Sequence, residues 1–426
     1  MTEVGQLPRD WHISSLGKLF DVRQGKAMSA ASRNGPAPKP FLRTSNVLWG
    51  KVDLSTVDKM HFTDEESKKF ALRPGDLLVC EGGEVGRAAV WDNQLPGCLY
   101  QNHIHRLRRI GENVDPRFFM YWLQEAILHL NIYEGAANRT TIPNLSAARL
   151  KEFAIPLPRP EEQRAIAAVL SKIQAAAETQ GRIVAALKEL KAATMAKVFR
   201  EGFHRTDATQ QTSFGEIPSG WQMLPLREVA SVQTGLAKGR LLVGEDVVEL
   251  PYLRVANVQA GYLDLAEIKT IRLRKSEVPR YALEPGDVLL TEGGDLDKLG
   301  RGHVWRGQIP KCVHQNHIFA VRPDTKRLLP EFLAYLAQSP YGRSYFLSVG
   351  HKTTNLACIN STKLKDFPVP LANLNDQRRI SSLLEKLDQQ IECYQREQGA
   401  LNSLFENALK GLMLGEIRLG SREAEQ

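Results

Sequence analysis

Cysteine and histidine are the residue types in this chain best suited to metal chemistry. They gather in two short stretches. The six residues are Cys98, His103 and His105, followed by Cys312, His314 and His317. Structural zinc takes four such ligands at close spacing, and each stretch offers three. When the stretches are aligned, His105 falls on Phe319 and His314 on Tyr100, so the two sets do not share a geometry. We interpret these residues as hydrogen-bonded groups on half-buried strands and expect no metal.

Other signatures of catalysis are weak or missing. No Gly-x-x-x-x-Gly-Lys-Ser/Thr phosphate loop occurs, so the sequence gives no sign of a nucleotide-driven motor. A nuclease might use Glu267-Ile268-Lys269, but the counterpart Thr56-Val57-Asp58 lacks the Glu and the Lys, and no acidic cluster surrounds the segment. Residues 81–83 and 292–294 both read Glu-Gly-Gly, which either cradles a phosphate through backbone N–H groups or forms a tight turn. We favour the turn, and we expect the chain to be non-catalytic.

These motifs belong to a unit that the chain contains twice. Residues 70–83 read FALRPGDLLVCEGG and residues 281–294 read YALEPGDVLLTEGG, an offset of 211. Gln-Asn-His-Ile recurs at 101–104 and 315–318, now at offset 214. The three extra residues lie in the Asp295–Lys298 region, where they indicate a loop insertion. A repeat of roughly 160 residues is therefore followed each time by a segment of different character.

Each repeat has the pattern of a small α+β module. Pro-Gly-Asp followed by a short apolar run is typical of a turn leading into a short buried strand. Pro116 and Pro330 each precede a run that predicts a helix, since proline suits a first helical turn. The fold class that follows is α+β, with two tandem mixed α/β modules.

The segments after the repeats predict two long helices. Residues 161–200 hold no proline and one glycine, and apolar residues recur every seven positions, with equivalent positions 214 residues later. The predicted seam is Ile166, Leu170, Ile173, Val184, Leu187 and Val198 with Ile380, Leu384, Leu387, Ile391, Leu401, Phe405 and Leu412. Such heptads indicate a coiled coil. At 1.5 Å per residue each helix is about 60 Å long, too long for one module to cover. We therefore expect the helices to pair in antiparallel fashion, with a module at each end; two separate surface helices are the alternative.

Composition is that of a soluble globular protein with a basic surplus. Of 426 residues, 42% are apolar and 24% charged, and the net charge of +8 favours a polyanionic partner. Five scattered cysteines fit reduced thiols in a cytoplasm. The N-terminus shows no signal peptide, and no apolar run is long enough for a membrane span.

Two loops in each repeat are rich in side chains that can contact base edges or phosphates. They differ between the repeats while the framework stays the same, as expected of two modules that recognise different DNA sequences. In the first repeat the candidates are Arg23, Lys26, Arg33, Arg43 and Asn46, then Asn138, Arg139, Thr140 and Thr141. In the second repeat they are Lys238, Arg240, Arg254 and Asn257, then Lys352, Thr353, Thr354 and Asn355.

The junction between module and helix resembles a known family. Ile155-Pro156-Leu157-Pro158, followed by Glu162-Gln163, is similar to the junction in specificity (S) subunits of type I restriction-modification systems. The second copy departs mildly, because Ala372 replaces the last proline and Asp376 the glutamate. The Pro-Gly-Asp strand with the Glu-Gly-Gly that follows it also resembles that family. The resemblance as a whole covers roughly residues 7–412.

The resemblance implies a function and partners. Each target-recognition domain would bind one half of a bipartite double-stranded DNA target. The helices would separate the two domains and bind two methyltransferase (M) subunits, which carry S-adenosylmethionine and methylate adenine. Motor-nuclease (R) subunits would join for cleavage. This chain has no Pro-Pro dipeptide and so lacks the Asn/Asp-Pro-Pro-aromatic motif of such a methyltransferase. We expect no cofactor in the chain itself and no membrane partner.

The expected boundaries follow from these segments. They are a first target-recognition domain over 1–158, a spacer helix over 159–205, a second domain over 206–372, a second spacer helix over 373–415 and a tail over 416–426. Two alternatives stay open at this stage. One is a nuclease with an unrecognised site, and the other is a protein scaffold that does not bind DNA.

Overall fold

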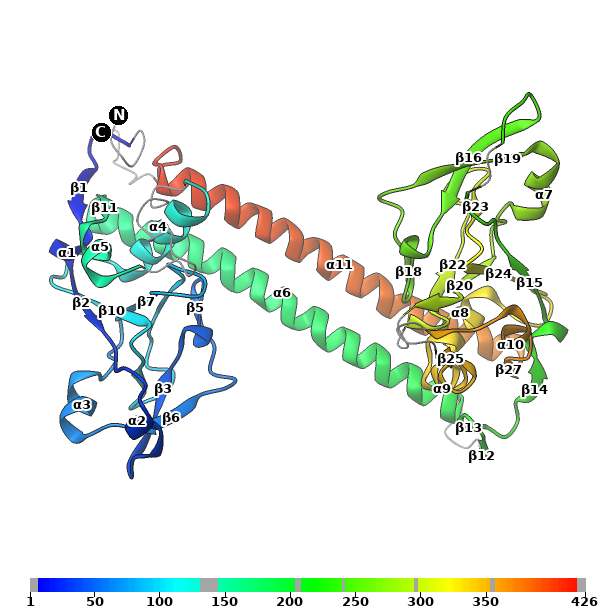
Figure 1. Ribbon diagram of the computed structural model, residues 1–426, viewed down its shortest axis with the longest axis horizontal. Helices are drawn as coiled ribbons and strands as arrows, with labels where there is room; N and C mark the ends of the chain where they lie inside the picture. The colour runs from blue at the N-terminus through cyan, green and yellow to red at the C-terminus, as the bar shows by residue number, and fades with distance from the viewer. Residues whose placement is uncertain are drawn as a thin grey trace, which may run out of the picture. The chain divides into compact units, whose positions relative to one another are not determined.

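The computed structural model describes residues 7–130, 145–203, 208–239, 242–294, 298–352 and 357–419 (Figure 1). The chain divides into two compact units. The first comprises residues 1–180 and 396–426, and the second residues 181–395. The division passes through both long helices, so each unit holds one repeat together with part of each helix.

The first unit is built from small sheets with short helices beside them. Its largest sheet is antiparallel, in the order β2 (Phe20–Gln24), β10 (Ile104–Arg109), β7 (Leu77–Cys80), β8 (Ala88–Val90). The smaller sheets are β6 (Asp58–His61), β3 (Pro38–Leu42), β9 (Leu99–Tyr100); then β4 (Val47–Leu48) with β5 (Lys51–Val52); and β1 (His12–Ser15) with β11 (Ala154–Leu157). The helices are α1 (Leu16–Leu19), α2 (Ala30–Asn34), α3 (Asp64–Lys69), α4 (Pro116–Leu128) and α5 (Ala147–Glu152).

The second unit has the same strand orders. The large sheet runs β15 (Ala230–Thr234), β24 (Ile318–Pro323), β20 (Val288–Thr291), β22 (Gly302–Val304). The smaller ones are β19 (Lys269–Arg274), β16 (Val247–Leu253), β23 (Val313–His314); β17 (Val258–Gln259) with β18 (Tyr262–Leu263); and β14 (Gln222–Pro225) with β27 (Pro368–Leu371). The sheets β12 (Thr209–Thr212) with β13 (Gly215–Pro218), and β21 (Gly293–Gly294), β26 (Ala357–Cys358), β25 (His351–Lys352), complete it. Its short helices are α7 (Val278–Tyr281), α8 (Pro330–Gln338), α9 (Pro340–Val349) and α10 (Ser361–Lys365).

The Pro-Gly-Asp motif starts the central strand of each large sheet. Gly75 and Gly286 have φ of 87° and 97°, a region that favours glycine. The aspartate that follows is buried and forms a bidentate ion pair with an arginine on the neighbouring strand. Arg108 donates to both oxygens of Asp76 at 2.7 Å, and Arg322 donates to those of Asp287 at 2.7 and 2.9 Å. The motif therefore fixes both the turn and the pairing of two strands.

The two long helices are α6 (Pro160–Glu201) and α11 (Leu374–Met413), which lie side by side in Figure 1. In the first unit the N-terminal part of α6 shares a hydrophobic core with the C-terminal part of α11. In the second unit the C-terminal part of α6 shares a core with the N-terminal part of α11. The helices are thus antiparallel in both units, and the predicted α+β class with a helical coiled coil is confirmed.

The residues predicted for the seam are all removed from solvent to some degree. Buried are Ile166, Leu170, Val184, Val198, Ile380, Leu384, Leu387, Ile391 and Leu412. Half-buried are Ile173, Leu187, Leu401 and Phe405. Near the helix ends, burial extends beyond the heptads to Phe199 and Leu409, because the modules pack there as well.

A buried glutamine attaches each long helix to its own module. Gln163 donates to the carbonyls of Asn113 and Pro158 at 3.2 and 2.8 Å, and accepts from the N–H of Asp115 at 2.9 Å. Gln377 donates to the carbonyls of Arg327 and Ala372 at 2.8 Å and accepts from the N–H of Leu329 at 2.8 Å. Both glutamines are fully buried. The glutamine of the junction motif therefore connects the first turn of the helix to the loop before α4 or α8.

Replacing this glutamine with alanine tests its contribution. Gln377→Ala leaves three backbone groups that are partly or fully buried without partners, and each such group costs about 1–3 kcal/mol. We expect the free energy of unfolding of the full chain to fall by about 3 kcal/mol or more, measured in urea. The matched control is Gln390→Ala, since Gln390 is exposed on the same helix. If the two substitutions lowered the free energy of unfolding equally, the role of Gln377 in attaching the helix to its module would be contradicted.

Candidate nucleic-acid interface

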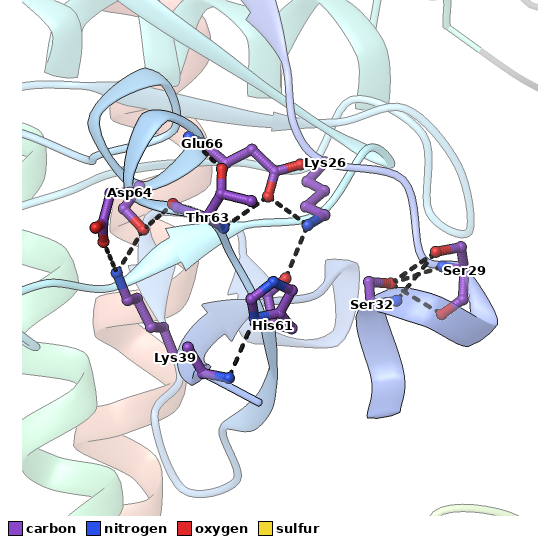
Figure 2. A network of polar contacts seen from close by, with 10 residues as sticks. Lys26, Ser29, Ser32, Lys39, His61, Thr63, Asp64 and Glu66 are labelled. Carbon is purple, nitrogen blue, oxygen red and sulfur yellow. Dashed lines mark hydrogen bonds and ion pairs between the residues drawn. The ribbon is translucent and has the colours of Figure 1, made fainter. Parts of the chain in front are cut away.

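In the first predicted loop, Lys26 is bonded to other residues of its own module. Its Nζ donates to the carbonyl of His61 at 2.8 Å and to Oε2 of Glu66 at 2.5 Å, and it lies 5.0 Å from the centre of the Phe62 ring (Figure 2). The hydrogen bond from Lys26 lowers the pKa of Glu66. Glu66 in turn caps α3 by accepting from the N–H of Thr63. The ammonium group is thus paired with Glu66 inside its own module, and we correct its predicted role from DNA contact to support of α3.

Asn46 and its equivalent Asn257 also need correction. Both are buried, with 5% and 3% of their surface exposed. Asn46 accepts from the N–H of Arg43 and donates to the carbonyls of Asp53 and Thr56. Asn257 makes the same three kinds of bond, to the backbone of Arg254, Asp264 and Glu267. The oxygen and the nitrogen of each amide are hydrogen-bonded to the backbone of their own loop, so these side chains are not available to contact bases in this structure.

The arginines beside these asparagines lie in ion pairs. Arg43 Nη1 is 2.8 Å from Asp58 Oδ2, and both side chains are about half exposed. Arg254 Nη2 is 3.4 Å from Glu267 Oε1. Lys269 Nζ approaches the same carboxylate at 3.6 Å. The Glu267–Lys269 segment considered as a nuclease site is therefore an ion-paired group on β19 and its approach.

Three further predicted residues are exposed, in addition to the ion-paired Arg43. They are Arg23 on β2, Arg33 on α2 and Lys238 after β15. Asn138, Arg139, Thr140 and Thr141 lie outside the described residues, as do Arg240, Thr353, Thr354 and Asn355. For Lys352 the structure gives only the backbone, in β25. The assignment of these residues to DNA contact stays a prediction.

Substitution of Asn257 separates a structural role from a base-contacting one. Asn257→Ala removes three hydrogen bonds from a buried site, and we expect a loss of about 2–3 kcal/mol in the free energy of unfolding. The preference among DNA half-sites should stay as in the parent. The control is Gln259→Ala in the same loop, where the side chain is half-buried and donates only to the carbonyl of Ala256. A changed half-site preference with unchanged stability would restore Asn257 as a DNA contact.

Of the residues considered as zinc ligands, four are buried and two are exposed: the buried ones are Cys98, His105, Cys312 and His314, and the exposed ones are His103 and His317. Among the residues that the structure describes, no three His, Cys, Asp or Glu side chains are grouped so as to hold a metal ion. Burial raises the pKa of the Cys98 and Cys312 thiols to about 12. His105 is buried on β10, with Nε2 at 2.8 Å from the carbonyl of Leu145. His314 is fully buried on β23.

The buried His314 predicts a dependence of stability on pH. Burial lowers its pKa to about 4 from a normal 6.5, so the unfolded chain binds the proton more tightly. The free energy of unfolding therefore keeps its full value, as far as His314 is concerned, above pH 6.5, and it decreases as the pH falls toward 4. Between pH 7 and pH 5 this amounts to about 2 kcal/mol. His314→Gln, neutral throughout, should unfold with a correspondingly weaker pH dependence. If the free energy of unfolding in urea changed with pH equally in parent and variant, the role of His314 would be refuted.

Comparison with known proteins identifies the family. A sequence model described as the type I restriction modification DNA specificity domain matches residues 8–189 and again residues 218–402. The chain belongs to this family. The predicted resemblance is thus confirmed, and with it DNA specificity as the function of the two repeats. No described helix has the length and apolar character needed to cross a membrane.

Individual relatives match along most of their length. The putative type I restriction enzyme MjaX specificity subunit of Methanocaldococcus jannaschii is 21% identical, with 98% of this chain and 96% of that protein covered. The type I restriction enzyme EcoBI specificity subunit of Escherichia coli is 23% identical, with 96% and 86% covered. The crystal structure of the type I S subunit from M. genitalium superposes with a TM-score of 0.60 at 19% identity, covering 97% of this chain and 99% of that one. The fold is shared across the family despite this divergence.

Proposed function

We propose that this chain is the non-catalytic specificity subunit of a type I restriction-modification complex. Each repeat binds one half of a bipartite duplex target, and the helix pair sets the gap between the halves. The observation that carries the proposal is structural repetition. Both units have the same strand orders, and each attaches to the start of its long helix through the same buried glutamine. Two similar recognition modules on antiparallel helices suit a target with two separated parts.

The partners follow from the same proposal. Two methyltransferase subunits dock on the helices and bring S-adenosylmethionine for adenine methylation, and motor-nuclease subunits join for cleavage in the cytoplasm. The outward positions of the helices offer room for docking, because Leu190 and its equivalent Leu404 are each 51% exposed.

A four-residue insertion after Ala177 tests whether the helices set the gap. It lengthens α6 by about 6 Å and rotates its far part by about 40°. Two base pairs advance a half-site by about 7 Å and rotate it by about 70°. We expect an active complex whose target keeps both half-sites with a gap longer by one or two base pairs. Methylation-site mapping of variant and parent gives the answer, and an active variant with an unchanged gap would overturn the spacing role.

The insertion experiment has a control of a different length. A seven-residue insertion keeps the heptad face, but its length of about 10 Å corresponds to three base pairs and about 100° of DNA rotation, so it serves as the control that should fit DNA less well.

A nuclease would cut DNA as the purified chain with magnesium, and the specificity subunit should not. A scaffold without DNA binding would show no salt-dependent affinity for duplex DNA.

A further inference from the structure

The Glu-Gly-Gly and Gln-Asn-His motifs meet at one end of the large sheet in both units. Glu81 directly follows β7 and His103 directly precedes the neighbouring strand β10, so the two residues face each other across the pair. The N–H of Glu81 donates to the carbonyl of His103 at 2.9 Å. Glu292 and His317 repeat this arrangement between β20 and β24, with the corresponding bond at 3.0 Å.

The side chains pair as well. In the second unit His317 Nδ1 lies 2.7 Å from Glu292 Oε2. In the first unit His103 Nδ1 lies 3.6 Å from Glu81 Oε2, because Gln24 donates to that oxygen at 2.8 Å. The carboxylates are sheltered, with 9% and 26% of the Glu81 and Glu292 side chains exposed. The imidazoles are open to solvent, at 54% and 56%. His317 is therefore hydrogen-bonded to its glutamate through one nitrogen, His103 lies near its glutamate at ion-pair distance, and both rings stay accessible.

Each glutamate of these pairs is bonded to a described residue that follows, in the sequence, the second set of predicted DNA contacts. Leu145, the first described residue after 131–144, donates its N–H to the carbonyl of Glu81 at 2.9 Å. Ile359 donates to the carbonyl of Glu292 at 2.9 Å. Gly293 and Gly294 form β21 beside β26, which corrects the tight turn expected from the second Glu-Gly-Gly. The chain leading from each predicted recognition segment is thus bonded to the glutamate of the pair.

We propose that His103 and His317 each donate a hydrogen bond from Nε2–H to a DNA phosphate, and that Glu81 and Glu292 orient them. The inference rests on the proposed function and names residues for it. Two modules that bind different half-sites share these residues, and a shared residue cannot distinguish sequences. What every half-site has in common is the sugar–phosphate backbone, so backbone contact is the role that fits. A ring that makes both contacts carries a hydrogen on each nitrogen, so that Nδ1–H faces the glutamate and Nε2–H faces the phosphate.

The second unit provides the sharper test, because Thr234 replaces Gln24 there and the His317–Glu292 pair is closer. In His317→Ala one charge-assisted contact is lost, so affinity should fall about tenfold for all duplexes alike. The slope of log affinity against log salt should become shallower by about 0.9. The ratio of affinities for cognate and altered second half-sites should stay unchanged. His317→Arg keeps a donor and should recover most of the affinity, and Glu292→Gln should lose part of it.

The matched control is His129→Ala in the first unit. His129 Nδ1 pairs with the buried Glu125 Oε2 at the same 2.7 Å and the ring is 45% exposed, but Arg343 stands at the equivalent position of the other repeat. This substitution should leave the salt slope as in the parent. All variants are measured as full-length chains, with urea unfolding to confirm that they are folded.

The outcomes separate this inference from the proposed function. Normal salt-dependent binding by the parent together with an unchanged slope in folded His317→Ala overturns the phosphate contact alone. A changed preference at the second half-site overturns it as well, because His317 would then contact bases. A parent chain that shows no salt-dependent binding to duplex DNA overturns the proposed function and this inference together.

Discussion

The structure depends on how two helices of about 40 residues bury their apolar faces. A module of about 160 residues can cover only part of such a helix, so the remaining apolar positions need a second helix. The two repeats supply one helix each, and the antiparallel arrangement lets every helix end enter the core of a unit. Ile166 and Leu170 join the core of the first unit, and Ile380 and Leu384 that of the second. Module stability and helix pairing are therefore parts of the same hydrophobic cores.

Polar groups inside these cores make the arrangement specific. Gln163 and Gln377 connect helix and module through backbone hydrogen bonds, and the Asp76–Arg108 and Asp287–Arg322 pairs connect neighbouring strands. An apolar contact tolerates sliding, whereas a buried amide with three partners has one position in which all of them are satisfied. The orientation of each module on its own long helix follows from such groups.

The two units are not copies in detail, and one difference concerns the helix pair. In the first unit the Tyr121 ring packs edge-on against Phe405, at 5.9 Å between centres. In the second unit Lys191 takes the position of Phe405 and binds Asp388 at 2.5 Å, while Tyr335 donates to Asp388 at 2.8 Å. Burial and the adjacent Asp388 carboxylate raise the pKa of Tyr335. The two helices thus have contacts that are not interchangeable.

The sequence by itself determined the features that arise from periodicity and repetition. Offsets of 211 and 214 exposed the two modules, and a period of seven indicated the paired helices, since covalent spacing dictates which side chains share a face. It also pointed to the family, through the junction that holds Gln163. Tertiary structure decided which polar residues remain available to a ligand. Lys26, Asn46 and Asn257 have the chemistry of DNA contacts, yet Glu66 and the loop backbone occupy them. His103 and His317 stay accessible, because only one of their nitrogens faces a carboxylate. The reason is that the partner of a polar group comes from a distant part of the chain, and local spacing carries no information about which segment will fold over it.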